Sequence, residues 1–320
     1  MNKYRKKIKV GITMGDPAGV GPQIIVKALK RLKDSAEFVI IADTRVLEKV
    51  SGFRSQVSGL KVIDLKNVNQ KDFRFGKVKA EYGRAAIEYL DKALDLIRGG
   101  EIDCLVTCPI SKEAVNLAGI KFSGHTEYLA KNTGTVDFVM MLLNKRLKIS
   151  LVTRHIPISS VSRQLTEEKL YKTIYITYQS LRKVFSIKNP RIVVAALNPH
   201  ASDNGLIGNE ENRIIKPVLN KLKHLAGHIN GPISADTAIL RAKEKKYDCV
   251  VAMYHDQALI ALKLSGIFHG VNITLGLPFV RTSPLHGTAF DIARTKSASP
   301  AALIEAIQLA IKCARNLKRA

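Results

Sequence analysis

Short apolar runs alternate along this chain with longer segments whose apolar residues recur at helical spacing. Runs of about four to eight apolar and β-branched residues indicate buried strands, and a period of about 3.6 indicates helices. Predicted strands cover residues 8–13, 38–42, 102–107, 147–153, 192–197 and 249–253. Predicted helices cover residues 24–32, 82–97, 166–185, 210–225, 238–246 and 299–317. The alternation predicts an α/β protein in which residues 50–79 form an irregular edge of little functional importance.

A histidine follows three of the predicted strands near the point where each strand ends. These are His155, His200 and His255, which follow residues 147–153, 192–197 and 249–253. If the three strands lie in one parallel sheet, their carboxyl ends bring the three imidazoles to the same edge. Three nitrogen ligands with open positions are typical of a catalytic metal site, whereas a lone histidine is more often a hydrogen-bonded structural residue. The repetition favours the metal site without excluding the structural role.

The stretch from residue 248 to residue 291 carries further polar side chains at and after the end of a predicted strand. They are Tyr254, His255, Asp256 and Gln257, then Lys263, Asn272 and Arg281, and finally His286, Gly287, Thr288 and Ala289. The apolar segments between these polar residues could fold back so that the polar side chains lie close together. Ligands of open α/β sheets bind at the carboxyl ends of the strands. We therefore expect a binding site to be built largely from this stretch.

Two glycine turns and one aspartate each permit two interpretations. Residues 14–22 (MGDPAGVGP) match neither the dinucleotide-binding fingerprint nor a P-loop, and fit either a tight turn or backbone amides that contact a ligand. His125 and Thr126 follow Gly124, where they could bind a ligand or cap the next helix. Asp236 precedes the helix predicted at residues 238–246 and fits an N-cap.

The composition is that of a globular protein, because 46% of the 320 residues are hydrophobic. The longest apolar run, residues 138–143, is far shorter than the roughly 18 residues that a membrane-spanning helix needs. The amino-terminal segment is basic but lacks the apolar region of a secretory signal, so we expect a cytoplasmic protein. The four cysteines are Cys104, Cys108, Cys249 and Cys313, and their spacing fits reduced, mostly buried thiols.

The net charge of +24 makes nucleic acid a candidate partner. The basic residues, however, form scattered short clusters, tryptophan is absent, and no nucleic-acid-binding motif accompanies them. We expect a solvated basic surface that attracts an anionic substrate, with no nucleic-acid partner and no membrane partner.

Seven motifs, taken in order, resemble those of the 4-hydroxythreonine-4-phosphate dehydrogenase family. They are MGDPAGVGP, SGHTEYL, LVTRHIP, LNPHASDNGLIGNEE, ADT, MYHDQALIALK and VNITLGLPFVRTSPLHGTAFDIA. The resemblance covers almost the whole chain. It implies an isocitrate/isopropylmalate dehydrogenase-like fold, with two interleaved α/β domains and a cleft between them. We expect a cofactor-side domain from residues 1–128 and 259–320, and a metal, substrate and dimerisation domain from residues 129–258.

The resemblance also implies roles for individual residues. His155, His200 and His255 would bind a divalent metal, with zinc favoured and cobalt or magnesium as alternatives. The substrate would be held by His125, Thr126, Lys263, Asn272 and Arg281. The adenosine end of NAD would lie on His286, Gly287, Thr288, Ala289 and Asp291. Asp256 and Asp236 would act as proton-transfer groups or support the metal ligands. The enzyme would be a homodimer with active sites shared across the interface, where His255 of one subunit completes a site with His155 and His200 of the other.

The implied activity is an NAD-dependent oxidation that is followed by decarboxylation. It converts 4-phosphooxy-L-threonine to 3-amino-2-oxopropyl phosphate in pyridoxal 5'-phosphate biosynthesis. A sister enzyme that oxidises 4-phospho-threonate or 4-phospho-erythronate is the alternative. A phosphate acyltransferase of related fold would not need the three histidines, and a metal-dependent hydrolase would not need residues 286–289. Arg294, Thr295 and Lys296 replace the glycine-rich continuation that the family leads us to expect, which leaves NAD and NADP open.

Overall fold

The computed structural model describes residues 7–32, 34–53, 59–225, 228–266, 269–295 and 297–319. The chain divides into two compact units. The first unit comprises residues 1–134 and 277–319, and the second comprises residues 135–276. The divisions expected from the sequence followed residues 128 and 258. In the structure the helix His255–Leu264 (α11) and the strand Val271–Leu275 (β10) belong to the second unit.

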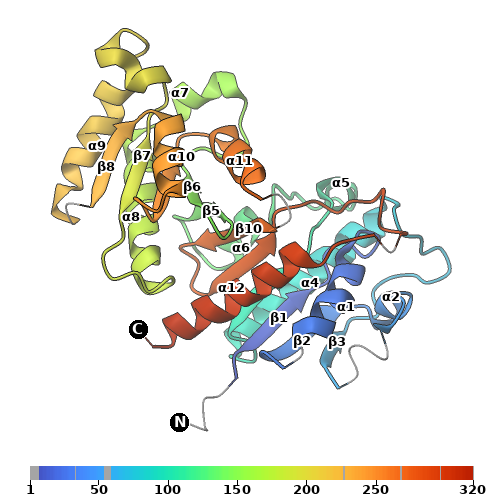
Figure 1. Cartoon of the computed structure of the whole chain (residues 1–320). Coiled ribbons are helices and arrows are strands. Elements are labelled where there is room, and N and C mark those ends of the chain that lie inside the picture. The colour runs from blue at the N-terminus through green and yellow to red at the C-terminus, as the bar shows by residue number, and fades with distance from the viewer. Residues whose placement is uncertain are drawn as a thin grey trace. The chain divides into compact units, whose positions relative to one another are not determined.

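The first unit is built on a parallel sheet. Its strand order is β3 (Lys61–Asp64), β2 (Glu37–Ala42), β1 (Lys9–Thr13), β4 (Cys104–Thr107) and β11 (Val280–Pro284), and each adjacent pair is parallel. Its helices are α1 (Gly21–Leu32), α2 (Thr44–Glu48), α4 (Ala80–Arg98), α5 (Lys112–Leu117), α6 (His125–Asn132) and α12 (Ala301–Leu317) (Figure 1). Helix α12 packs on β4 and β11, and α4 packs on β1 and β2. This cover explains why the central strands are almost continuously apolar.

The second unit contains a mixed sheet. Its strand order is β10, β5 (Val139–Leu143), β6 (Lys148–Leu151), β9 (Cys249–Ala252), β7 (Ile192–Ala195) and β8 (Ile229–Ile233). The pairs of β5 with β10 and with β6 are antiparallel, whereas β6, β9, β7 and β8 run parallel. The helices are α7 (Val161–Gln164), α8 (Glu167–Lys183), α9 (Lys216–Lys221), α10 (Ala235–Lys243) and α11 (Figure 1). Shorter helical turns are η1 (Ile158–Ser160), η2 (Pro199–Gly205), η3 (Glu211–Ile215) and η4 (Lys223–Leu225).

Several elements differ from the sequence-based prediction. Strand β3 lies inside residues 50–79, which were expected to be irregular, and forms the edge of its sheet. The helix predicted at residues 210–225 is divided into η3, a π-helix, followed by α9 and η4. Pro217 lies at the start of α9 and lacks the amide hydrogen that would continue a helical hydrogen-bond ladder. No helix among the described residues is both long and apolar enough to cross a membrane.

Helix α10 corrects the interpretation of Asp236. The helix was expected from residue 238, with Asp236 as its N-cap, but it begins at Ala235. Ser234 occupies the N-cap position, and its side chain makes no capping hydrogen bond. Asp236 is therefore an exposed residue of the first turn, where its charge complements the helix dipole.

Candidate functional site

The three histidine-bearing strands are neighbours in the sheet of the second unit. Strand β9 lies between β6 and β7 and runs parallel to both. His155, His200 and His255 follow the carboxyl ends of β6, β7 and β9. The structure thus confirms the expectation that these strands lie in one parallel arrangement and release the histidines at the same edge.

His155 and His255 lie close together at this edge. Their ring centroids are 5.4 Å apart. Both line a cavity of about 230 Å³ together with Arg154, Tyr254, Asp256 and four residues of the segment 156–161. The Nδ1 atom of His255 lies 2.7 Å from Oδ1 of Asp256. A carboxylate on one ring nitrogen leaves the other nitrogen as a potential metal ligand, so this pair fits a metal site.

His200 does not join this pair within one chain. Among the described residues, no group of three or more His, Cys, Asp or Glu side chains is placed to hold a metal ion. His200 begins a run of residues 200–204 that all have left-handed dihedrals, with φ between 40° and 69°. Each such non-glycine residue costs roughly 1–2 kcal/mol, so surrounding contacts must hold the turn. The sequence pattern gave no indication of this strained turn.

Arg281 forms the centre of a second cluster, in the first unit. Its side chain on β11 is only 1% exposed, and burial lowers its pKa to about 9, so it remains a cation at neutral pH. Nε and Nη2 donate hydrogen bonds of 3.2 and 2.6 Å to Oγ1 of Thr107, at the end of β4. Strands β4 and β11 are adjacent and parallel, with Arg281 opposite Leu105, and the guanidinium of Arg281 reaches Thr107 at the carboxyl end of β4.

His125 belongs to the same cluster as Arg281. Burial, followed by the positive charges of Arg281 and Lys112, keeps the pKa of His125 well below its ordinary value, so the imidazole is neutral. Nε2 of His125 is buried and has no hydrogen-bond partner among the described residues. A backbone hydrogen bond at Cys108 opposes this lowering of the pKa. A ligand can supply the hydrogen bond that the buried Nε2 lacks among the described residues.

The histidine and threonine of this cluster do not cap the helix that they begin. Helix α6 starts at His125, and Gly124 occupies its N-cap position without a side-chain capping bond. Thr126 lies in the first turn and is buried. The amino-terminal end of α6 and the guanidinium of Arg281 both favour an anion. The first unit thus places His125 near the charge of Arg281, and Thr126 follows His125 in the first turn of α6.

Lys263 and Asn272 belong to the second unit. Lys263 is exposed in the last turn of α11. Asn272 lies on β10 opposite Leu142 of β5, and its Oδ1 atom is buried without a hydrogen-bond partner among the described residues. A buried amide oxygen that lacks a donor is costly, and a ligand can supply that donor. This observation supports Asn272 as a binding residue.

The proposed cofactor loop packs against the glycine turn of the first unit. Val20 N donates to Thr288 O at 2.9 Å, and a Cβ on Gly19 would lie 3.0 Å from the same oxygen. Gly15 has φ of 71°, and its Cβ would lie 2.4 Å from Pro109 O. The amides of residues 16, 18, 19 and 20 all donate to protein atoms. The structure therefore favours the tight turn over amides that contact a ligand.

The exposed part of the cofactor loop is open to solvent. His286, Gly287 and Asp291 are exposed, and nothing lies within 4 Å of a Cβ built on Gly287. Ala289 has a left-handed φ of 45°. Arg294 donates from Nε to Phe75 O at 2.8 Å, so one of the residues that replace the expected glycines fastens this loop. Lys296 lies outside the described residues.

Asp16 is a buried carboxyl group that the sequence analysis did not single out. It lies in the glycine turn, and its Oδ1 accepts a hydrogen bond from Ala18 N at 2.9 Å. Its Oδ2 has no partner among the described residues. Burial raises the pKa of Asp16 from 3.8 to about 7, against the opposing effect of the backbone hydrogen bonds.

The raised pKa predicts a pH-dependent contribution to stability. The folded state favours the protonated form of Asp16. Its contribution to the free energy of unfolding is therefore complete below about pH 4 and is lost as the pH rises through 7. The full shift corresponds to about 4 kcal/mol. We expect Asp16→Asn to raise the melting temperature relative to wild type at pH 8 but not at pH 4. Thermal unfolding across this range is the measurement, and exposed Asp34→Asn is the control. An equal effect at both pH values would contradict the assignment.

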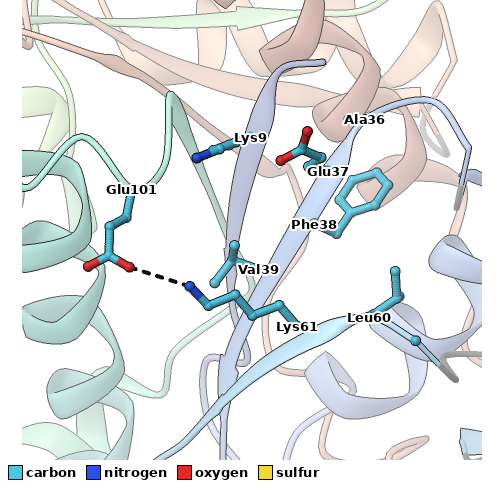
Figure 2. A pocket seen from close by; sticks show the side chains of 9 residues that line it. Lys9, Ala36, Glu37, Phe38, Val39, Leu60, Lys61 and Glu101 are labelled. Atoms are coloured by element: carbon cyan, nitrogen blue, oxygen red, sulfur yellow. Dashed lines mark hydrogen bonds and ion pairs between the residues drawn. The ribbon is translucent and has the colours of Figure 1, made fainter. Parts of the chain in front are cut away.

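Other features of the first unit do not resemble an active site. A cavity of about 340 Å³ lies beside the amino-terminal ends of β1 and β2, with Lys9, Glu37, Phe38, Lys61 and Glu101 among its lining residues. Lys61 and Glu101, both about half exposed, form an ion pair of 3.4 Å there, which Figure 2 draws as a dashed line. The four cysteines of the chain, three in the first unit and Cys249 in the second, are free and buried, as predicted, and burial raises the pKa of Cys249 to about 11. They are poor nucleophiles.

The chain has an α/β fold of the isocitrate dehydrogenase-like type. Isocitrate dehydrogenase from Methylococcus capsulatus shares this fold, with a TM-score of 0.52 and 14% identity over 98% of this chain and 89% of that chain. A branched-chain phosphotransacylase from Enterococcus faecalis is similar to the same degree, with a TM-score of 0.57 and 15% identity over 95% and 98% of the two chains. The fold alone therefore does not select the chemistry.

The sequence is decisive. The profile of the family described as "Pyridoxal phosphate biosynthetic protein PdxA" matches residues 19–310, and the chain belongs to this family. A 4-hydroxythreonine-4-phosphate dehydrogenase from a Sulfurihydrogenibium species is 42% identical over 97% of this chain and all of that protein. The crystal structure of the enzyme of that name from Klebsiella pneumoniae has a TM-score of 0.86 and 37% identity, covering 97% and 100%.

A second activity occurs among these relatives. D-threonate 4-phosphate dehydrogenase from Salmonella typhimurium is 41% identical over 95% of this chain and 98% of that protein. Both names describe dehydrogenases, so the chain is an oxidoreductase of a family whose chemistry implies a nicotinamide cofactor. The expected enzyme class and fold class are confirmed.

Proposed function

We propose that this enzyme oxidises the C3 alcohol of 4-phosphooxy-L-threonine with NAD. The hydroxyl loses a proton, C3 transfers a hydride to NAD, and the resulting β-keto acid loses carbon dioxide to give 3-amino-2-oxopropyl phosphate. This places the reaction in pyridoxal 5'-phosphate biosynthesis. The observation that carries the proposal is the buried Arg281 beside the unpartnered Nε2 of His125, in a chain of this family.

Each unit by itself carries residues that we propose for the phosphorylated substrate. Arg281 supplies a buried positive charge for the phosphate, and Thr126 together with the amino-terminal end of α6 supplies hydrogen-bond donors. The neutral His125 accepts a hydrogen bond from a substrate hydroxyl or ammonium group at Nε2. Asn272 accepts another at its buried Oδ1, and Lys263 adds a second positive charge.

A divalent metal is the second requirement. His155, His200 and His255 would hold it, and neutral imidazoles favour zinc, with cobalt and magnesium as alternatives. Such an ion supplies Lewis-acid stabilisation of the charge that develops on the C3 oxygen. Asp256 orients the ring of His255 through its 2.7 Å contact with Nδ1. The exposed Asp236 is retained as a candidate proton-transfer group on the resemblance alone.

NAD is proposed to lie on residues 286–289 and Asp291, with NADP as the alternative. The open space at Gly287 and the exposure of His286 support this position. The hydrogen bond from Arg294 to Phe75 O uses Nε and not the two terminal nitrogens of the guanidinium. Comparing kcat/KM for the two cofactors in wild type and Arg294→Gln tests whether this residue selects between them. A selective loss of NADP activity would assign Arg294 to the additional phosphate.

The alternative substrate is D-threonate 4-phosphate, or a related phosphorylated sugar acid, because a relative with 41% identity carries that name. The two substrates differ at C2, where one has an ammonium group and the other a hydroxyl. NADH formation from 4-phosphooxy-L-threonine, D-threonate 4-phosphate and 4-phospho-erythronate decides between them. A higher kcat/KM for either sugar acid would overturn the proposed substrate while leaving the reaction type intact.

The site is proposed to be shared between two copies of the chain. Large exposed apolar side chains follow each histidine within six residues of the sequence, namely Ile158 at 70%, Leu206 at 87% and Ile260 at 61%, and Ile158 also lines the cavity at His155 and His255. Exposed apolar side chains can belong to an interface between proteins. In the proposed homodimer, His255 of one subunit completes a site with His155 and His200 of the other. The 5.4 Å approach of His155 and His255 within one chain makes a different division the alternative to test.

Mixing inactive subunits distinguishes the two divisions. With the proposed division, subunits carrying His155→Ala and His255→Ala form mixed dimers in which one site has both defects and the other has none. Random pairing should restore roughly a quarter of wild-type activity. Mixing His155→Ala with His200→Ala should restore none. If His155 and His255 instead act from the same subunit, only mixtures containing His200→Ala recover, and no recovery in any mixture after proven subunit exchange would exclude a shared site.

A further inference from the structure

Glu211 is a buried carboxylate for which the proposed reaction has no direct use. Its side chain belongs to a fully buried residue at the start of η3. Oε1 accepts hydrogen bonds of 2.8 Å from Leu197 N and from Asn198 N. Oε2 accepts one of 2.9 Å from Asn198 Nδ2. The carboxylate thus binds the backbone and the side chain of Asn198, just beyond the end of β7.

The position of Asn198 gives this contact its importance. Asn198 lies two residues before His200, and Pro199 alone separates it from the left-handed turn of residues 200–204. Left-handed residues other than glycine persist only where surrounding contacts impose them. Glu211 fixes the point from which the turn begins. Without that anchor, the backbone would relax toward ordinary dihedrals and carry the His200 imidazole away from its position.

Glu210 extends the same contact to the segment that follows His155. Its Oε2 accepts a hydrogen bond of 2.8 Å from Asn198 Nδ2. Its Oε1 accepts one from the hydroxyl of Ser162, on α7. These hydrogen bonds, from Ser162 first and Asn198 second, lower the pKa of Glu210 to about 2, so it is ionised. One network therefore joins α7 to the base of the turn that carries His200.

Gly208 shows how tightly the loop closes over this network. Its φ is 80°, and an added Cβ would lie 2.5 Å from Asn198 Nδ2 and 2.9 Å from Glu210 Oε2. Only glycine allows the backbone to approach both groups with this dihedral angle. The Asn198 amide is thereby enclosed between two carboxylates and a backbone turn.

We propose that Glu211, acting through Asn198, is a positioning residue that sets His200 for metal binding, with Glu210 and Ser162 holding that position relative to the His155 segment. This inference rests on the proposed metal role of the histidines. Glu211 itself touches neither metal nor substrate. Partners of this kind typically change metal affinity by about 10- to 100-fold when they are replaced.

The test compares Glu211→Gln with wild type in metal-depleted full-length enzyme. A glutamine keeps the shape but places an NH₂ group against the NH₂ of Asn198, which breaks that contact. Cobalt binding is followed by its visible absorption without substrate, and activity is then measured over a cobalt titration. We expect the dissociation constant for cobalt to rise about 10- to 100-fold, with kcat at saturating cobalt within about threefold of wild type.

A purely structural role gives a different result, because a smaller folded fraction lowers activity at every cobalt concentration without moving the half-saturation point. That outcome, or an unchanged cobalt affinity, would overturn the proposal. Glu244→Gln, at a half-exposed ion pair on the same unit, is the matched control and should not change the affinity. If Glu211→Gln does not fold, Ser162→Ala at an exposed position decides instead, with a several-fold loss of affinity expected and an unchanged affinity contradicting the proposal.

Failure of the inference can be separated from failure of the proposed function. If wild-type enzyme and His200→Ala bind cobalt equally, the histidines are not the metal site, and the function proposed above is wrong in that respect. If His200→Ala loses cobalt binding but Glu211→Gln does not, the metal site stands and only the positioning role is rejected.

Discussion

Removing the divalent metal should abolish NADH formation, and His200→Ala should reproduce this loss. We expect kcat/KM to fall by at least about 1,000-fold in both cases, because the charge developing on the C3 oxygen would lose its stabilisation, which is worth several kcal/mol. Zinc or cobalt should restore the chelated wild-type enzyme but not the variant. A neutral site of two remaining imidazoles binds such ions too weakly at low metal concentration.

The controls for this prediction are a second histidine and a direct measurement of metal. His224→Ala changes another exposed histidine of the second unit, in η4, and should leave both metal content and activity unchanged. Metal content is measured by elemental analysis of the purified protein. Full activity of His200→Ala in metal-free buffer would remove the metal from the mechanism.

The placement of the three histidines could be predicted because it depends on local sequence and one general rule. Each apolar strand and the histidine that follows it can be recognised from a short stretch of sequence. Parallel strands in one sheet have their carboxyl ends at a common edge. The pairing of β9 with both β6 and β7 fulfils this condition. The contact between His255 and Asp256 is also local, since the two residues are adjacent.

The left-handed turn could not be predicted for the opposite reason. Residues 200–203 are His-Ala-Ser-Asp, and none of them is a glycine, the residue that would have indicated a positive φ. The proposed support of the turn comes from Glu211, which lies in a separate element. Glu211 lies near the start of the helix that the sequence predicts at residues 210–225, where an exposed position would be expected. Its burial and its bonds to Asn198 become visible only when β7 and η3 are placed together.

Strands β10 and β11 show a related limit. Asn272 lies in β10 (VNITL) and Arg281 in β11 (VRTSP), and because both strands contain further polar residues, neither was predicted as a strand. The family resemblance implied that both side chains bind the substrate, but burial of the guanidinium against Thr107 depends on pairing between β4 and β11, which are far apart in sequence. The sequence motifs therefore suggested roles for these two residues but did not predict the strands on which they lie.

Arg281→Met should remove most of the enzyme's preference for a phosphorylated substrate. The replacement keeps a long side chain in the buried site but removes the positive charge, which water cannot replace there. We expect kcat/KM for the phosphorylated substrate to fall by about 1,000-fold or more, as for loss of a charged contact worth about 4 kcal/mol. The much lower value for the unphosphorylated alcohol should change little.

Binding of inorganic phosphate provides a test of Arg281 that does not depend on activity. A ligand that binds only the folded protein raises its melting temperature, so phosphate should stabilise wild type but not Arg281→Met. Arg84→Met, at an exposed position on α4, should respond to phosphate as wild type does. Sulfate, another tetrahedral dianion, should act as phosphate does. Chloride at equal ionic strength only screens the +24 net charge, so its effect should be equal on all three proteins. If Arg281→Met keeps both the phosphate-induced stabilisation and the substrate preference, the phosphate group is recognised elsewhere, and the first unit's buried cation has another purpose.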